Sequence, residues 1–224
     1  MTTPTPAFAS AAADLLYSDV EEQLRASVRD LLATRSPVAA VITRTESSEP
    51  YDPALWRALA IDIGVTALAV PVQHGGHGAS WREVAVVAEE LGASVAPTPF
   101  LGHTMATVAA RIAGASDLIP QLVSGERTGA LAVSAVPFGT DVDVRDGVLV
   151  GTVRGVIDAV SADVFLVPTS MGMHAVEADQ VTATRITSLD MTRPLCDLTF
   201  DGATAHQLSA PRPGAHDGAL LIGG

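Results

Sequence analysis

Three histidines are the side chains in this sequence that most resemble a metal-binding set. His74 and His77 flank the glycines of a short loop, and His103 lies farther along the chain. A Gly-rich loop does not hold ligands at helical spacing, and no Cys or acidic residue lies close by to complete a zinc site. We therefore expect no metal here, and interpret the loop as a tight surface turn whose glycines adopt positive φ.

An acidic segment could suggest calcium chemistry. Asp141-Val142-Asp143 is followed by Asp146-Gly147. A calcium loop needs a bidentate Glu at its twelfth position, where Thr152 stands if Asp141 is the first, and the glycine is displaced by one position. We interpret the segment as a polar turn between strands.

Two other groups carry reactive side chains but are expected to do no chemistry. The pair Glu89-Glu90 lies on a predicted helix, where we expect it to solvate the outer face rather than act as acid or base. Cys196 enters a predicted apolar strand, where a cysteine is more often a small buried hydrophobe than a nucleophile. The sequence also has no G-x-S-x-G, Walker or G-x-G-x-x-G motif, so hydrolase and nucleotide-fold interpretations lack support.

The first half of the chain is expected to be helical. Ser18 with Glu21, and Ser80 with Glu83, are capping boxes that begin two helices. Asp52 followed by a proline begins another. Apolar residues recur at helical spacing after each start. The expected helices run from residue 19 to Pro37, from Pro53 to Gly64, from Trp81 to Gly92, over Leu101–Ile112 and over Ser116–Val123.

After Gly129 the apolar residues change to short β-branched or alternating runs, which predict strands. Turn signals such as Asp146-Gly147 and Asp201-Gly202 separate them. The predicted strands are Ala130–Val136, Val148–Val153, Asp163–Pro168, Met173–Glu177, Val181–Ile186 and Asp197–Phe200. Helices first and strands second predict an α+β fold, with an all-helical domain followed by a small antiparallel β-barrel or sandwich.

Composition excludes several classes of partner. Twenty-five acidic and 13 basic residues, all of the latter Arg, give a formal net charge of -12 in 224 residues. Such a surface repels nucleic acid and anionic membranes. No segment approaches 18 uninterrupted apolar residues, and the N-terminus lacks the pattern of a secretory signal. With a single cysteine, the chain is expected to act in the cytoplasm.

Several motifs in order resemble one enzyme family. The segment from Asp14 to Ser18 leading into a charged helix, the helix carrying Trp56, and the Pro71–Gly78 loop resemble the N-terminal helical domain of actinobacterial acyl-CoA dehydrogenases. In the second half, similar motifs resemble the middle β-domain of these enzymes. They are Leu149-Val150-Gly151, Asp158-Ala159, Ala162-Asp163, the run from Ser188 to Arg193, and Asp197 with Phe200-Asp201-Gly202.

This resemblance implies a reaction. These enzymes desaturate an acyl-CoA thioester between its α and β carbons, with a carboxylate as base and FAD as hydride acceptor. The flavin lies between the middle β-domain and a C-terminal helical bundle, which usually supplies the base. The chain ends where that bundle would begin, so the resemblance assigns no catalytic residue here. The expected division is a helical domain at 1–127, a β-domain at 128–212, and the start of a missing region at 213–224.

Two segments are similar to the flavin-binding segments of the family. In the first, Ser134 and Thr140 keep the hydroxyls that the family places near the flavin, whereas Ala135 and Val136 replace a Glu-Pro pair. The resemblance implies that Ser134 and Thr140 bind the cofactor and also face the thioester. The alternative is that both are ordinary strand and turn hydroxyls.

The second segment usually reads Trp-Ile-Thr, with the indole flanking the flavin ring. Gly155-Val156-Ile157 stands in its place, so neither functional side chain is present, and Gly155 and Ile157 are expected only to line the ring. Two functions therefore remain open. One is FAD-dependent α,β-dehydrogenation of an acyl-CoA of fatty-acid or steroid side-chain breakdown. The other is a non-catalytic subunit supporting a flavin-bearing partner, and both imply a homo- or hetero-oligomer.

Overall fold

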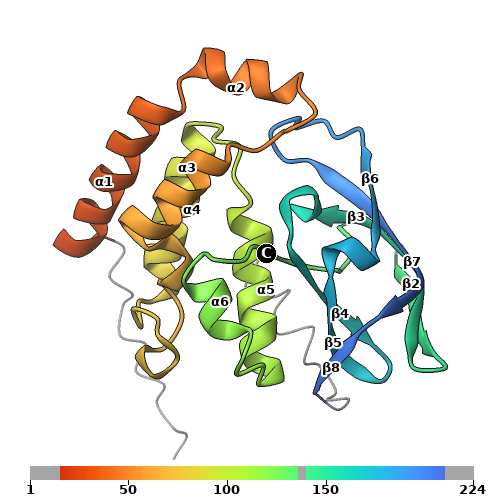
Figure 1. The fold of residues 1–224 in the computed structure, drawn as a ribbon. Coiled ribbons are helices and arrows are strands. Elements are labelled where there is room, and N and C mark those ends of the chain that lie inside the picture. Colours follow the sequence, from red (N-terminus) through yellow and green to blue (C-terminus); the bar gives the residue numbers. More distant parts are fainter. Residues whose placement is uncertain (1–15, 136–139, 210–224) are drawn as a thin grey trace, which may run out of the picture.

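The computed structural model describes residues 16–135 and 140–209, so the first 15 residues of the expected helical domain and the expected region 213–224 lie outside the described residues. Helices occupy the first part of the chain and strands the second, which confirms the α+β fold class (Figure 1). Within the described ranges, no helix combines the length and the apolarity needed to cross a membrane.

The helical part begins where the capping signals predicted. Helix α1 spans Asp19–Arg35 and α4 spans Trp81–Ala93, and both have complete capping boxes. Asp52 accepts hydrogen bonds from the first turn of α3, Pro53–Ala58. A π-helical turn, Leu59–Ile63, extends α3 and ends at Gly64, which has φ 78°. Helices α5, Phe100–Ala113, and α6, Ile119–Val123, complete the order.

One helix was missed by the sequence analysis. Helix α2, Val38–Thr45, follows Pro37, for which the sequence predicts only the end of α1. A proline also suits the start of a helix, because the first helical N–H groups have no partner within the helix. Gly92 lies inside α4 rather than ending it, and Ser94 forms the cap.

The strands form two four-stranded sheets rather than one closed barrel. One sheet has the order β1-β4-β5-β8, from strands Gly129–Leu131, Val164–Thr169, Gly172–Glu177 and His206–Ser209. The other has the order β2-β3-β7-β6, from strands Thr140–Arg145, Val148–Ile157, Leu195–Thr204 and Thr182–Ile186. All described pairs are antiparallel except β1 with β4, which is parallel. Parallel strands need a long crossover connection, and the β2–β3 hairpin of the other sheet provides it between β1 and β4.

The acidic segment that we interpreted as a turn is a strand. Thr140–Arg145 pairs with β3, with Thr140 opposite Val153 and Arg145 opposite Val148. Only Asp146-Gly147 turns the chain, and both residues have positive φ. Asp and Val alternate along β2, and this period of two residues is typical of a strand with one buried face. The similarity of the acidic residues to a calcium loop directed our interpretation toward a turn instead.

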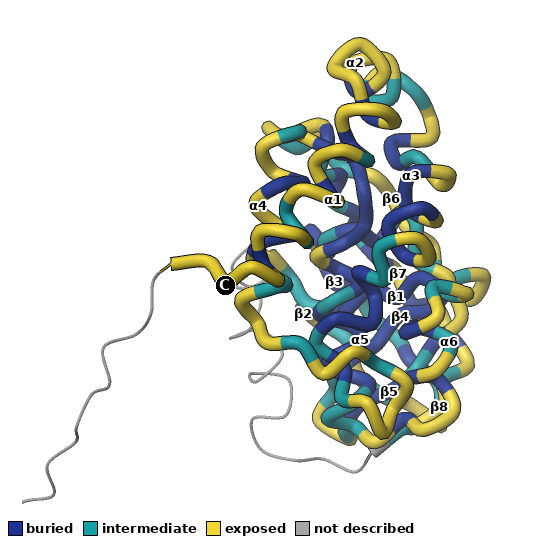
Figure 2. The backbone as a smooth tube through the Cα atoms, turned by 90° about the vertical axis from the view of Figure 1, so that its left-hand side faces the viewer, coloured by how far each residue is buried: buried dark blue, intermediate teal, exposed yellow. Residues whose placement is uncertain are grey.

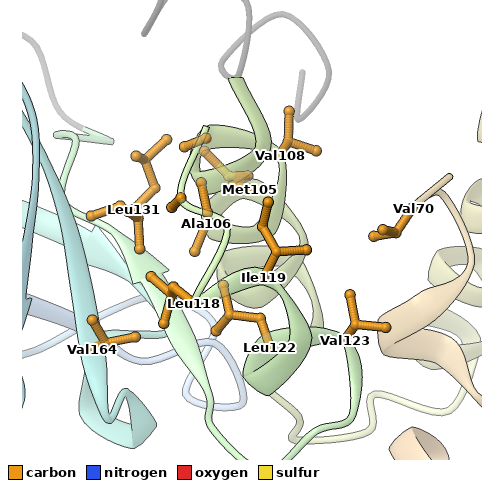
Figure 3. Packing of buried hydrophobic residues seen from close by; sticks show 14 of the residues in the cluster. Val70, Met105, Ala106, Val108, Leu118, Ile119, Leu122, Val123, Leu131 and Val164 are labelled. Atoms are coloured by element: carbon orange, nitrogen blue, oxygen red, sulfur yellow. The ribbon is translucent and has the colours of Figure 1, made fainter. Parts of the chain in front are cut away.

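The core is continuous across the helical and β parts. One cluster packs α5 and α6 against the sides of β1 and β4 that face the helices, through Ala106, Leu122, Leu131 and Val164 (Figure 3). A second lies between the sheets and includes Leu149, Phe165, Cys196, Leu198 and Phe200. In Figure 2, α5 and the strands beside it are mostly buried, whereas α2 is mostly exposed. Helix α5 is therefore the element that joins the two parts.

Of the pair Glu89-Glu90, only Glu89 is exposed as we expected, whereas Glu90 is buried against α1. Glu90 is buried and accepts hydrogen bonds from Arg25 and Arg29 of α1, with nitrogen–oxygen distances of 2.8 Å to each. Glu89, at the edge, binds Arg25 at 2.7 Å and accepts a hydrogen bond from the Tyr17 hydroxyl. The pair forms the ion cluster between α1 and α4.

Candidate functional site

The two segments assigned to flavin binding lie beside each other. The chain leaving β1 passes the bulged end of β3, and the Ala135 N–H donates to the Gly155 carbonyl at 3.2 Å. Ser134 is half-buried at this edge. Thr140 begins β2 opposite Val153 of β3, and Val136–Gly139 lie outside the described residues. The backbone thus brings Ser134, Thr140 and Gly155 to one end of the sheet, while their assigned roles stay predictions.

Gly155 has a backbone conformation that favours glycine. It lies in a β-bulge between Val153 and Val156, with φ 65°. Its N–H donates to Asp197 Oδ1 at 2.9 Å, so this donor is already satisfied within the chain. A large side chain such as Trp would meet the steric penalty of left-handed backbone at this position. Ile157 is half-buried opposite Leu195.

An apolar cavity of about 450 Å³ lies between α4 and α5. Arg193, half-buried, is the only charged residue among those that line it. The guanidinium is fixed by donation from Nη1 to the Ala96 carbonyl at 2.7 Å and to the Thr192 carbonyl at 3.2 Å. The other lining residues are apolar or carry small hydroxyls: Trp81, Val84, Ala85, Ala88, Leu91, Gly92, Thr98, Phe100, Leu101, Thr104, Met105 and Val108.

The sequence analysis did not find this cavity. The signal was available in α4, where small residues recur on the face that carries Trp81, so that the helix leaves a groove instead of filling it. The cavity is large enough for an extended apolar ligand rather than a single solvent molecule. An arginine in an otherwise apolar wall adds one donor for a polar group of such a ligand.

A buried carboxylate connects α5, one of the two helices beside this cavity, to the end of β3. Asp158, directly after β3, is fully buried and accepts a hydrogen bond from the Tyr51 hydroxyl on Oδ1. Its Oδ2 accepts from the Gly102 N–H, in the first turn of α5, at 2.7 Å. Burial raises the pKa of Asp158, while the bonds from Tyr51 and Gly102 and the charge of Arg193 act in the opposite direction. In the sequence, Asp158 stands out only as part of the Asp158-Ala159 motif of the family, and no local pattern marks it as a buried acceptor.

His103 has a structural position inside the helical part. It is buried edge-on to Trp56, and its Nδ1 accepts from the Gly129 N–H at 3.3 Å. Burial lowers the pKa of His103 to about 4, so the ring is neutral at pH 7 and can act as this acceptor. Among the residues that the structure describes, no group of three or more His, Cys, Asp or Glu side chains could hold a metal ion.

Cys196 packs between the two sheets. It is buried on β7, and burial raises the pKa of its thiol to about 11. The reactive form of a cysteine is the thiolate, which this environment disfavours. Its position agrees with the role of a small buried hydrophobe that we expected.

The chain is similar to known proteins over most of its described length. Residues 18–126 match the family model described as acyl-CoA dehydrogenase, N-terminal domain. A curated relative, acyl-CoA dehydrogenase IpdE2 of Mycolicibacterium smegmatis, is 36% identical over 129 residues, covering 58% of this chain and 41% of the relative. The chain therefore spans about two fifths of the length of that relative.

Solved structures share the fold. The ChsE4-ChsE5 complex from Mycobacterium tuberculosis aligns with a TM-score of 0.80 at 23% identity, over 93% of this chain and 61% of that one. An acyl-CoA dehydrogenase complexed with FAD from Bacillus anthracis aligns with a TM-score of 0.76 at 16% identity, over 92% of this chain and 40% of that one. At these identities the similarity shows the arrangement of helices and sheets and nothing finer.

Proposed function

We propose that this chain supplies the helical and β parts of an FAD-dependent acyl-CoA dehydrogenase, because residues 18–126 match the N-terminal domain of that family. The proposed division keeps a helical domain at 1–127 and a β-domain at 128–212. The proposed compartment is the cytoplasm, which the single buried cysteine suits. The proposed reaction is α,β-dehydrogenation of an acyl-CoA, with the proton-abstracting carboxylate supplied from outside the chain.

The cavity between α4 and α5 carries this proposal, because its shape and lining suit an acyl chain. The nine apolar side chains that line it would exclude water from a bound hydrocarbon chain, which stabilises binding by about 0.8 kcal/mol for each buried methylene. Arg193 would donate to an oxygen of the ligand. Gly102 lies on α5 beside the lining residue Leu101, and its N–H donates to Asp158 at the end of β3. The acyl cavity and the proposed flavin edge are therefore neighbours.

The residues at the flavin edge fit the cofactor in part. Ser134 offers a hydroxyl at an edge formed by backbone, the type of donor that suits the polar rim of the ring. Gly155 and Ile157 offer neither an indole to stack nor a hydroxyl to donate. When bound, FAD would supply the hydride-accepting chemistry. The residues of this chain would line one side of the ring, and we expect Ser134 and Thr140 to orient the thioester.

A specific observation favours the second function, a subunit that supports a flavin-bearing partner. The Gly155 N–H is held by Asp197 and the Gly155 carbonyl by Ala135, so the bulge is complete without a ligand. One of the similar solved structures is a complex of two named components, ChsE4 and ChsE5. A hetero-oligomer with an acyl-CoA dehydrogenase-like subunit would provide the missing stacking group and base.

A titration with a saturated long-chain acyl-CoA tests the acyl cavity. Trp81 lines the cavity, so its fluorescence should change on binding, while Trp56 stays buried away from it. Ala88→Phe should weaken binding about tenfold, because the ring would displace about two methylenes of the ligand. Ala88 is exposed on α4, so the fold should tolerate the change.

The matched control is Ala93→Phe, on the exposed part of the same helix but outside the cavity lining. It should leave the affinity within about twofold of the wild type, since surface substitutions cost little. Free coenzyme A should give a much smaller signal. Equal binding by Ala88→Phe and the wild type would show that the cavity is not the acyl site.

A further inference from the structure

We propose that Asp158 is a positioning residue that sets the acyl-cavity wall on α5 against the flavin-side edge of β3, using Tyr51 and Gly102 as its two anchors. This inference rests on the proposed function, because it assigns a ligand to each of the two surfaces. The inference concerns the position of the cavity wall relative to the flavin edge, which the residues of either surface alone do not determine.

The carboxylate of Asp158 joins three segments that are distant in sequence. Tyr51 lies in the loop before α3, Gly102 in the first turn of α5, and Asp158 directly after β3. Each carboxylate oxygen accepts from a different segment, and all three residues are buried. A buried carboxylate without donors would be strongly unfavourable, so the two donors and the acceptor depend on one another.

The backbone at Asp158 transmits its position to the flavin edge. Asp158 has φ 58°, a left-handed conformation that is uncommon for residues other than glycine and asparagine-like residues. It follows Ile157, the last residue of β3, and the bulge at Gly155 is only three residues away. A shift of Asp158 therefore moves the stretch Gly155–Ile157 directly.

On the cavity side, α5 approaches Asp158 closely because the residue at the contact, Gly102, has no side chain. A Cβ built at Gly102 would lie 2.6 Å from Asp158 Cβ and 3.0 Å from the Ile157 carbonyl oxygen. The neighbours of Gly102 in α5, Phe100, Leu101 and Thr104, line the cavity. The glycine thus allows direct contact between the helix that forms the cavity wall and the end of β3.

Arg193 adds a second connection at the same junction. It lines the cavity, and its Nη1 binds the Ala96 carbonyl in the segment between α4 and α5. Its positive charge also favours the ionised form of Asp158, whose pKa burial raises. The cavity wall therefore has two points of attachment to the β part, one through Asp158 and one through Arg193.

Three substitutions of Asp158 separate its side chain from its backbone conformation. Asp158→Asn keeps an acceptor for Gly102 and tolerates left-handed backbone. Asp158→Gly keeps the conformation but loses the side chain, and Asp158→Ala loses both. Tyr51→Phe is a milder variant that removes one donor and keeps the ring, so it tests the inference even where Asp158→Ala folds poorly.

The measurement is native-state hydrogen exchange on the whole chain at the amides of Gly102, Gly155 and Ile157, with Leu59 in the helical core as reference. Asp158→Ala and Asp158→Gly should accelerate exchange at all three junction amides by about 30-fold, the effect of losing two hydrogen bonds, relative to Leu59. Tyr51→Phe should give about fivefold. Asp158→Asn should restore exchange close to the wild type.

The inference is overturned if acceleration stays confined to Gly102, or if Asp158→Gly behaves like the wild type. Affinities for acyl-CoA and for FAD, measured on the same proteins, should fall together in Asp158→Gly and recover in Asp158→Asn. A wild-type chain that takes neither ligand overturns the proposed function instead. The exchange pattern still decides whether Asp158 couples the two surfaces.

Discussion

Gly102→Ala is expected to destabilise the protein by about 3 kcal/mol. The added Cβ would approach Asp158 Cβ to 2.6 Å and the Ile157 carbonyl to 3.0 Å, and both atoms belong to backbone-anchored groups that cannot rotate away. Relief requires α5 to move from β3, which would break the bond from the Gly102 N–H to Asp158. Equilibrium unfolding in urea measures the loss.

The control for this prediction is Gly92→Ala. Gly92 is exposed in α4, a Cβ built on it would meet no atom within 4 Å apart from its chain neighbours and the nearby backbone of its own helix, and its φ is not in the left-handed region. Alanine in a helix is favoured over glycine by about 0.5–1 kcal/mol, so this variant should be slightly more stable. A Gly102→Ala protein as stable as the wild type would contradict the close contact between α5 and β3.

Glu90→Ala is expected to destabilise the protein by about 2–3 kcal/mol. Glu90 is buried between α1 and α4, and its removal leaves Arg25, also largely buried, without its inner partner. Breaking a buried pair from one side costs about 3–5 kcal/mol. The expected figure is lower because the side chain of Arg29 is 61% exposed and can be solvated. Thermal and urea unfolding measure the change.

Glu89→Ala is the matched control, since the side chain of Glu89 is 51% exposed and binds the same Arg25. Its loss should cost less than about 1 kcal/mol, the range of surface ion pairs. A Glu89→Ala protein less stable than Glu90→Ala would contradict the assignment of Glu90 as the centre of the cluster.

Acid provides an independent check on Glu90. Hydrogen bonding to Arg29, and then to Arg25, lowers the pKa of Glu90 in the folded protein. The stabilisation is therefore present above the unfolded value of about 4.3 and is lost as the pH falls through the lower folded value. The stability difference between the wild type and Glu90→Ala should shrink as the pH falls below about 4. A difference that stays constant from neutral pH to pH 3 would contradict the ion-pair explanation.

Local signals in the sequence predicted many of the elements. The capping boxes at Ser18 and Ser80 and the cap at Asp52 placed three helix starts correctly, because each depends on residues within one turn. Helix α2 and strand β2 were missed, the first because Pro37 can either end or begin a helix. Strand β2 was missed because we interpreted its acidic residues as a polar turn and did not use the alternation of Asp with Val.

Contacts between distant residues could not be predicted from the sequence. Tyr51 and Asp158 are 107 residues apart, and nothing local marks either as the partner of the other. Glu89 and Glu90 are adjacent in α4, but Glu89 lies at the edge of the helix and Glu90 faces α1. Glu90 is buried only because α1 packs on that face, which the sequence of α4 alone does not indicate. The flavin segments came from a resemblance, and the structure places Ser134 beside Gly155 without testing their roles.

The visible absorption spectrum of the purified chain, recorded after addition of FAD and gel filtration, tests the central claim most directly. If the chain provides one side of an FAD site, a flavin band should elute with the protein, and Ser134→Ala should reduce the retained fraction. A colourless protein after exposure to excess FAD would contradict flavin binding by this chain. The function as a subunit supporting a flavin-bearing partner would then be favoured.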